Sequence, residues 1–156
     1  MVQLHIYTDG AHSSKTNTGG WAYLIIDDAN NILHQRYDGE VETTNNRMEM
    51  TAVAEALQYI ADTMPQVSTI TICVDSAYVC NAFVHNWIAT WLNNGWKTTS
   101  KSLVKNKDLW QKMIKLIRKL EKQYKIIFTK VEGHSTNKYN NIVDKLAVQG
   151  RKEANK

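Results

Sequence analysis

Three runs near the amino terminus alternate apolar and polar residues and predict β-strands. A period of two is typical of a strand that buries one face. In the second run, Trp21, Tyr23 and Ile25 share one face. Short turns between the runs indicate an antiparallel meander, with strands through about Thr8, over 21–26 and over 32–37.

The period then changes to about 3.6 residues, which predicts a helix. This helix begins near Asn46, and its apolar stripe includes Val53 and Leu57. Stepping back four residues from Val53 places Glu49 at the head of the stripe. A carboxylate in line with a core-facing stripe is unusual and marks Glu49 as a candidate functional residue.

The rest of the chain alternates strand and helix patterns, which indicates an α/β sheet. A strand is predicted over 69–74, and a helical segment follows it. A tryptophan-rich helical stretch (87–96), a polar loop (97–107), a clear amphipathic helix from about Leu109, a strand (125–131) and a helix from about Asn141 complete the pattern. We therefore predict an α/β fold with a five-stranded mixed sheet flanked by four or five helices.

Length and charge limit the possibilities without naming a function. The 156 residues fit one domain with its own core, and neither a repeat nor a linker rich in Pro, Gly or Ser interrupts them. The formal net charge of +4 and a pI of about 9.0 favour a polyanionic partner. Ordinary solvated lysines explain this excess equally well.

The two cysteines, Cys73 and Cys80, indicate no metal site or disulfide framework. They form neither a CxxC pair nor a Cys/His cluster, and we predict buried free thiols. No stretch approaches the length of a signal-peptide core or a membrane span. The expected setting is therefore soluble, reducing and cytoplasmic, with no membrane partner.

Four carboxylates are the candidate chemistry. Asp9 and Asp75 each follow a predicted strand, at the sheet edge where α/β proteins bind ligands. If these strands are parallel neighbours, the two aspartates lie close together, and Glu49 and Asp144 at helix starts could join them. Oxygen-only ligands select Mg²⁺ or Mn²⁺, and a pair of such ions supports phosphodiester hydrolysis.

Each carboxylate also has a purely structural explanation. Asp9 and Gly10 form a common turn pair, and Asp75 could cap the next helix. Glu49 and Asp144 could each close a capping box with the asparagine three residues earlier. Taken singly these explanations are favoured, whereas the four residues together on one sheet favour a functional site.

His134 precedes Asp144 in a predicted loop. It is either a surface residue or a proton carrier, because an unperturbed imidazole titrates near neutral pH. The sequence around it does not separate these two roles.

Several motifs occur in a fixed order over residues 1 to 150. They are Tyr7-Thr8-Asp9-Gly10, Thr44-Asn45-Asn46-Arg47-Met48-Glu49, Asp75-Ser76-Ala77-Tyr78, Gly95-Trp96-Lys97-Thr98, and Gly133-His134 with Asp144 ten residues on. This ordered series resembles the type 1 ribonuclease H family, the cellular nucleases of RNA–DNA hybrids. The resemblance implies the ribonuclease H-like fold, with one domain over 1–150 and a polar tail over 151–156.

The resemblance also implies an activity. The family hydrolyses the RNA strand of a hybrid endonucleolytically by two-metal-ion catalysis, leaving a 5′-phosphate and a 3′-hydroxyl, with Mg²⁺ as cofactor and Mn²⁺ as a possible substitute. Asp9, Glu49, Asp75 and Asp144 occupy the positions of the metal-binding carboxylates. His134 matches a loop histidine that assists water activation or product release.

Six further residues match the family's substrate contacts. They are Asn45 and Asn46 at the minor groove, Thr44 at the DNA backbone, and Trp87, Trp96 and Lys97 in the handle that grips the DNA strand. Tryptophans supply stacking surface and lysines neutralise phosphates, although a core role explains some of the tryptophans too. The expected partner is an RNA–DNA hybrid bound by a monomer.

Two departures from the family pattern affect substrate binding. Leu92-Asn93-Asn94-Gly95 stands where many bacterial relatives carry basic residues, so the handle's electrostatic grip is expected to be weaker. Ala77 stands where a glutamine often contacts RNA. Two other functions are left open: a non-catalytic nucleic-acid-binding module, and a nuclease of the same fold that acts on DNA.

Overall fold

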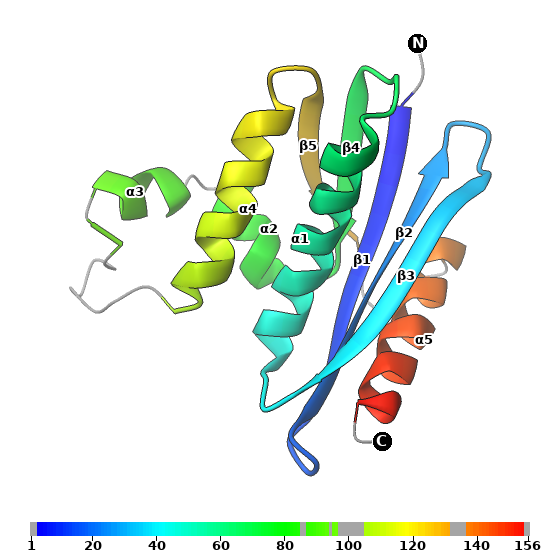
Figure 1. The fold of residues 1–156 in the computed structure, drawn as a ribbon, viewed down its shortest axis with the longest axis vertical. Helices are drawn as coiled ribbons and strands as arrows, with labels where there is room; N and C mark the ends of the chain where they lie inside the picture. The colour runs from blue at the N-terminus through cyan, green and yellow to red at the C-terminus, as the bar shows by residue number, and fades with distance from the viewer. Residues whose placement is uncertain (1–2, 85–86, 94, 97–104, 132–136, 155–156) are drawn as a thin grey trace.

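A five-stranded mixed sheet forms the centre of the molecule (Figure 1). The computed structural model describes residues 3–84, 87–93, 95–96, 105–131 and 137–154. The strands are β1 (Gln3–Ser13), β2 (Thr18–Asp27), β3 (Ile32–Val41), β4 (Thr69–Val74) and β5 (Lys125–Lys130), in the spatial order β3-β2-β1-β4-β5. The first three pair antiparallel, whereas β4 pairs in parallel with β1 and with β5. The predicted five-stranded mixed sheet is confirmed.

Helices cover both faces of the sheet. They are α1 (Asn45–Thr63), α2 (Ala77–Val84), α3 (Trp87–Asn93), α4 (Lys107–Leu120) and α5 (Lys138–Glu153). The larger core joins the sheet to α1, α2 and α4, and a smaller core joins it to α5. Figure 1 shows α3 and α4 on the side of the molecule away from α5. None of the described helices combines the length and apolar character needed to cross a membrane.

Strand β2 is buried along nearly its whole length because it serves both cores. Trp21, Tyr23 and Ile25 belong to the larger core, as their shared face predicted. Ala22 and Leu24, which alternate with them, pack under α5. A strand covered on both faces loses the apolar–polar alternation, which explains its almost continuous apolar sequence.

Strand β1 continues well past Thr8, where the sequence predicted its end. It runs to Ser13 because β2 continues beside it, with Asp9 opposite Ala22 and Gly10 opposite Trp21. The turn explanation of Asp9 is therefore wrong. The predicted position just past a strand end is wrong as well, because Asp9 lies inside β1.

Helix α5 lies very close to β2 and β3 at three glycines. A Cβ atom on Gly20 would collide with the carbonyl oxygen of Ala147, and one on Gly39 with that of Gly150. A Cβ atom on Gly150 would likewise collide with the carbonyl oxygen of Asp38 in β3. Without side chains between them, the helix can rest directly on the sheet.

The limits of α5 differ from the predicted ones. The helix starts at Lys138, where Asn137 caps it, and continues to Glu153. Residues 151–153 are therefore helical, so the polar tail does not begin directly after Gly150. These polar residues form the last turn of the helix. The carboxylate of Glu153 accepts a hydrogen bond from the Tyr37 hydroxyl at 2.9 Å.

Both cysteines are buried free thiols, as predicted. Burial raises the pKa of the Cys73 thiol to about 11, so this group stays protonated at neutral pH.

Candidate active site

Asp9 and Asp75 lie side by side because β1 and β4 are parallel neighbours. Thr8 pairs with Val74, and the next residue of each chain is an aspartate. β4 ends at this point while β1 continues beside β2. The predicted meeting of the two aspartates at the carboxyl end of β4 is confirmed, with Asp9 only 4% exposed.

Helix α1 brings Glu49 to the same place through a close contact with Gly10. A Cβ atom on Gly10 would lie 2.5 Å from the backbone nitrogen of Glu49, so only glycine admits the helix at this distance. The Glu49 side chain is buried and interacts with the Asp9 carboxyl. The helix is capped by Thr44, whose hydroxyl accepts a hydrogen bond from the N–H of Arg47 at 3.2 Å.

Helix α5 supplies Asp144 from the opposite face of the sheet. Its carboxyl shares a hydrogen bond with that of Asp9, although Asp144 is otherwise exposed. The cap of α5 is Asn137, which accepts from the N–H groups of Tyr139 and Asn140. Asp144 therefore lies well inside the helix.

The capping explanations fail for the other carboxylates too. Glu49 is not paired with Asn46 in a capping box, because Thr44 is the cap. Asp75 does not cap α2, since the hydroxyl of Ser76 accepts the hydrogen bond from Val79. With the turn explanation of Asp9 also excluded, no structural alternative is left that accounts for the four carboxylates.

Burial and mutual repulsion shift the acidity of the two innermost groups. The pKa of the Asp9 carboxyl is raised to about 7, first by burial and then by its hydrogen bond with Asp144, while the N–H of Gly10 donates to it and opposes the shift. Burial, followed by the charges of Asp9 and Asp75, raises the pKa of Glu49 well above its usual value. Negative charge is therefore costly here unless a cation balances it.

The donor set fits an oxygen-preferring divalent cation. The four carboxylates form a chain of neighbours in which Asp9 contacts Asp144 and Glu49, and Glu49 faces Asp75. Hard cations such as Mg²⁺ and Mn²⁺ take carboxylate oxygens as ligands. In the part of the chain that the structure describes, however, no three His, Cys, Asp or Glu side chains surround one point as the ligands of an ion would. Metal ligation therefore stays a prediction.

A groove of about 320 Å³ opens beside the acidic residues. Residues of the α1 amino terminus and of the β4–α2 junction line it, namely Asn45, Asn46, Glu49, Asp75, Ser76, Ala77 and Tyr78. The structure thus places the predicted minor-groove residues Asn45 and Asn46 next to two of the predicted metal ligands.

The other predicted substrate contacts are placed less completely. Thr44 is exposed at the cap of α1. Trp96 is half-buried, and its ring lies 6.3 Å from that of Trp91. The helical stretch predicted through Trp96 ends at Asn93, because Gly95 and Trp96 have positive φ angles.

Three predicted contacts lie partly or wholly outside the described residues. Trp87 begins α3, but its side chain is not among those described. His134 and Lys97 both lie outside the described ranges.

A polar network that the sequence did not reveal links the groove to α4. The Arg47 guanidinium donates to both carboxylate oxygens of Asp108, at 3.1 and 2.8 Å, and to the side-chain oxygen of Asn106 at 3.3 Å. Asn106 and the Trp110 indole donate in turn to the Tyr78 hydroxyl, each at 3.3 Å. Arg47 and Tyr78 stood within the motifs, but no local pattern points to partners so far along the chain.

Known proteins resemble this chain over nearly its whole length. The RNase H family model matches residues 1–152. Ribonuclease H of Acetivibrio thermocellus is 40% identical over 156 residues, which are 100% of this chain and 99% of the relative. Ribonuclease H of Chlorobaculum parvum is 43% identical over 148 residues, or 95% and 94% of the two chains.

Solved structures show the same architecture. LC9-RNase H1, a type 1 RNase H with the type 2 active-site motif, matches 97% of this chain and 73% of its own with a TM-score of 0.80 at 23% identity. LC11-RNase H1, solved in complex with an RNA/DNA hybrid, matches 98% and 99% of the two chains with a TM-score of 0.71 at 20% identity. The fold is thus of the ribonuclease H-like class. The family model and the sequence relatives show further that the chain belongs to the RNase H family.

Proposed function

We propose that this protein is an endoribonuclease that hydrolyses the RNA strand of RNA–DNA hybrids with the help of divalent metal ions. The observation that carries the proposal is the contact of Asp9 with both Glu49 and Asp144, at the sheet edge where Asp75 follows β4. Membership of the RNase H family supports it, and so does the hybrid that LC11-RNase H1 binds.

Asp9, Glu49, Asp75 and Asp144 are the proposed ligands of two Mg²⁺ ions, with Mn²⁺ as a substitute. Bound there, the ions would acidify a water molecule and balance charge on the scissile phosphate, giving 5′-phosphate and 3′-hydroxyl ends. The protein's own part is to hold four carboxylates at one edge. Their ionised form is needed for binding, because a protonated carboxyl is a poor ligand.

The groove residues are proposed to select the substrate. Asn45 and Asn46 offer amide donors and acceptors within the groove that Glu49 and Asp75 also line. An RNA strand displays 2′-hydroxyls in its minor groove, and these groups both donate and accept hydrogen bonds. Contacts from Thr44, Trp87, Trp96 and Lys97 to the DNA strand would complete the recognition of a hybrid.

His134 is proposed to assist proton transfer or product release. Replacing it with alanine should lower turnover more than hybrid binding, because an assisting group acts in the reaction and not in the bound state. Equal losses of both would reassign it to substrate contact. The monomeric state and the cytoplasmic location stay predictions from the sequence.

The decisive experiment is a cleavage assay on three matched duplexes of one sequence: an RNA–DNA hybrid, double-stranded RNA and double-stranded DNA. With Mg²⁺, we expect cleavage of the RNA in the hybrid alone, and none after chelation of the metal. Preferred cleavage of duplex DNA would instead favour a DNA nuclease of the same fold.

The variant Asp9→Asn separates an enzyme from a binding module. It should abolish cleavage and leave hybrid binding intact, because the change removes charge but keeps the shape of the side chain. A wild-type protein that binds hybrids but cuts none of them, with either Mg²⁺ or Mn²⁺, would overturn the proposed activity.

A further inference from the structure

Positive charge is concentrated in one segment of the chain. Nine of the 19 Lys and Arg residues lie between Lys105 and Lys130, where the only acidic residues are Asp108 and Glu121. The remainder has 10 basic and 13 acidic residues. The excess that makes the protein basic is therefore local, and a uniformly solvated surface does not account for it.

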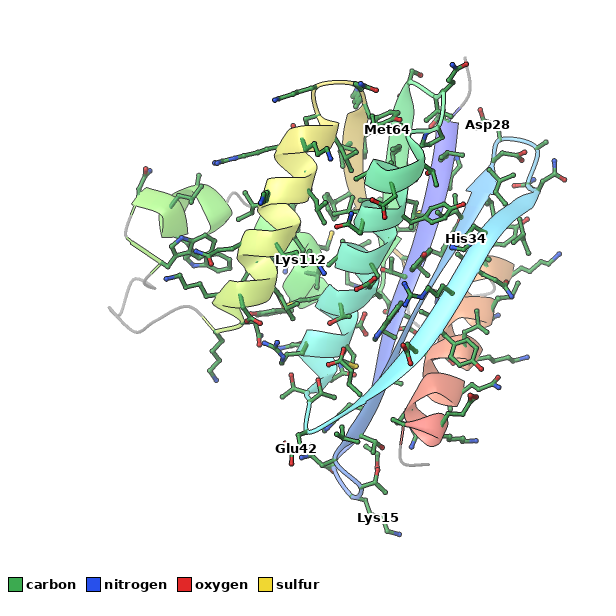
Figure 2. The ribbon with its side chains drawn as sticks, in the orientation of Figure 1. Lys15, Asp28, His34, Glu42, Met64 and Lys112 are labelled. Atoms are coloured by element: carbon green, nitrogen blue, oxygen red, sulfur yellow. The ribbon has the colours of Figure 1, made fainter. Side chains whose placement is uncertain are left out.

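Helix α4 carries five of these nine residues, and three of the five lie on one exposed face. Its other face is buried through Trp110, Met113, Ile114, Leu116, Ile117 and Leu120. The cationic stripe consists of Lys115, Arg118 and Lys119, which helical spacing brings to one side of α4, and of Lys122 in the turn that follows the helix; all four are exposed. Among the described residues none of these four has an acidic group within salt-bridge distance. The neighbouring Lys112, labelled in Figure 2, instead pairs with Glu55 of α1 at 3.7 Å.

The stripe continues into a hollow of about 330 Å³ between α3 and α4. Lys115 and Arg118 line this hollow together with the half-buried Trp96. The backbone N–H of Trp96 donates to the carbonyl of Trp91 at 2.7 Å, and the Trp91 ring packs 5.3 Å from that of the buried Trp110. An aromatic ring anchored to the core therefore adjoins two cations.

Helix α3 itself contributes no charge to this region, since Trp87–Asn93 contains neither Lys nor Arg. Lys115 to Lys119 spans about 6 Å along α4 at the helical rise per residue, and Lys122 extends the stripe into the turn that follows the helix. Phosphates of one duplex strand recur about every 3.4 Å along the axis, so the stripe can face about three of them.

We propose that Trp96 and the cationic stripe of α4 form a nucleic-acid-binding surface that holds the backbone of the substrate duplex outside the segment being cut. The proposal rests on the proposed function for its substrate. The charges contact phosphates, which carry no sequence information, so this surface adds affinity that is independent of base sequence and sensitive to salt.

The test compares two triple variants that remove the same charges. The first is Lys115→Gln, Arg118→Gln, Lys122→Gln, and the control on α5 is Lys138→Gln, Arg151→Gln, Lys152→Gln. Each is placed in the Asp9→Asn background, and binding to a hybrid of about 24 base pairs, roughly two turns, is followed by fluorescence anisotropy over a salt series.

The α4 variant should lower the slope of log affinity against log salt by about two to three, at about one for each lost phosphate contact. Its affinity at about 100 mM salt should fall about tenfold, whereas the α5 control should stay within about twofold of the parent. With Asp9 restored, kcat at saturating hybrid should be unchanged while KM rises. The charge-retaining variant Lys115→Arg, Arg118→Lys, Lys122→Arg should keep the parent slope.

Equal losses in the α4 and α5 variants would overturn the proposal, because net charge alone would explain them. So would an unchanged slope in an α4 variant whose circular dichroism spectrum and Tm match the parent. Poly-glutamate serves as a second ligand that represents an acidic protein partner. If the α4 variant loses binding to poly-glutamate but keeps its binding to the hybrid, the stripe is assigned to such a partner instead. Absence of cleavage by the wild type leaves this binding test intact, so the two proposals fail separately.

Discussion

Gly10 of β1 lies directly beneath the backbone of Glu49, at a distance that leaves no room for a Cβ atom. The atoms that a Cβ would meet are the backbone nitrogen of Glu49 and the carbonyl carbon and Cβ of Met48, none of which can rotate aside as the far end of a side chain could. The start of α1 is thereby held against β1, beside Asp9.

The variant Gly10→Ala should therefore lower both stability and activity. Overpacking a tight contact costs about 1–3 kcal/mol, and a displaced helix start would carry Glu49 away from Asp9. Urea unfolding and kcat on a hybrid substrate would measure the two effects. An alanine variant with parental stability and kcat would show that the helix can shift freely and that the contact does not position Glu49.

The metal-free protein should lose stability as pH rises from about 4 to about 7. The pKa of Asp9 is raised to about 7 in the folded chain, chiefly by burial, so the folded state binds more protons than the unfolded state across this range. Asp9→Asn should flatten this dependence and stabilise the metal-free protein at pH 7.5 by about 1–3 kcal/mol, since one pKa unit corresponds to about 1.4 kcal/mol. Chemical unfolding with chelator present, at several pH values, measures both. A parent whose stability rises relative to that of Asp9→Asn over this interval would contradict the raised pKa of Asp9, because other groups such as His34 titrate in both proteins.

Added Mg²⁺ should raise the Tm of the parent, and more strongly at pH 8 than at pH 6. Ion binding requires ionised carboxylates, and a ligand that binds only the folded state stabilises it by about 2.7 kcal/mol at a hundredfold excess over Kd. Hybrid cleavage should increase over the same pH interval. Differential scanning fluorimetry with Mg²⁺, and with Na⁺ at equal ionic strength as control, would reveal the shift. If Mg²⁺ raises the Tm of Asp9→Asn as much as it raises that of the parent, the ion binds at another site.

The ion pair between Arg47 and Asp108 should hold the start of α1, which lines the groove, in place against α4. Both side chains are partly exposed, so a double-mutant cycle of Arg47→Ala and Asp108→Ala should give a coupling free energy of only about 0.5–1 kcal/mol. The effect on KM for a hybrid should be the clearer one, because Arg47 follows directly on Asn45 and Asn46, which line the groove. The variant Arg47→Lys keeps the charge but loses the forked contact, and it should raise KM too. If the effects of the two substitutions on the free energy of unfolding are additive and KM is unchanged, the ion pair does not contribute to substrate binding.

The sequence predicted the parts of the site that local patterns encode. The strand over 69–74 was placed correctly because its apolar run and its ends are local signals. The approach of Asp9 to Asp75 was predicted on the condition that their strands are parallel neighbours, as a crossover through the intervening helix would make them. The odd position of Glu49 at the head of an apolar stripe correctly marked a buried carboxylate.

What could not be predicted depends on contacts between distant segments. Strand β1 passes Thr8 because β2 pairs with it there, and the residues of β1 alone do not show this. The partner of Arg47 is a residue on another helix, and helical or strand periodicity carries no information about such pairs. The polar residues after Gly150 were interpreted as a tail, whereas α5 continues to Glu153 and Gly150 packs closely against Asp38 of β3.

The close seating of α5 on the sheet has a consequence for how the protein matures. Asp9, Glu49 and Asp75 all precede α5 in the chain, whereas Asp144 lies within it. During translation the acidic edge is therefore incomplete until α5 has emerged from the ribosome and docked onto Gly20 and Gly39. A newly made chain would thus acquire its fourth carboxylate only after the segments that carry the other three have been synthesised.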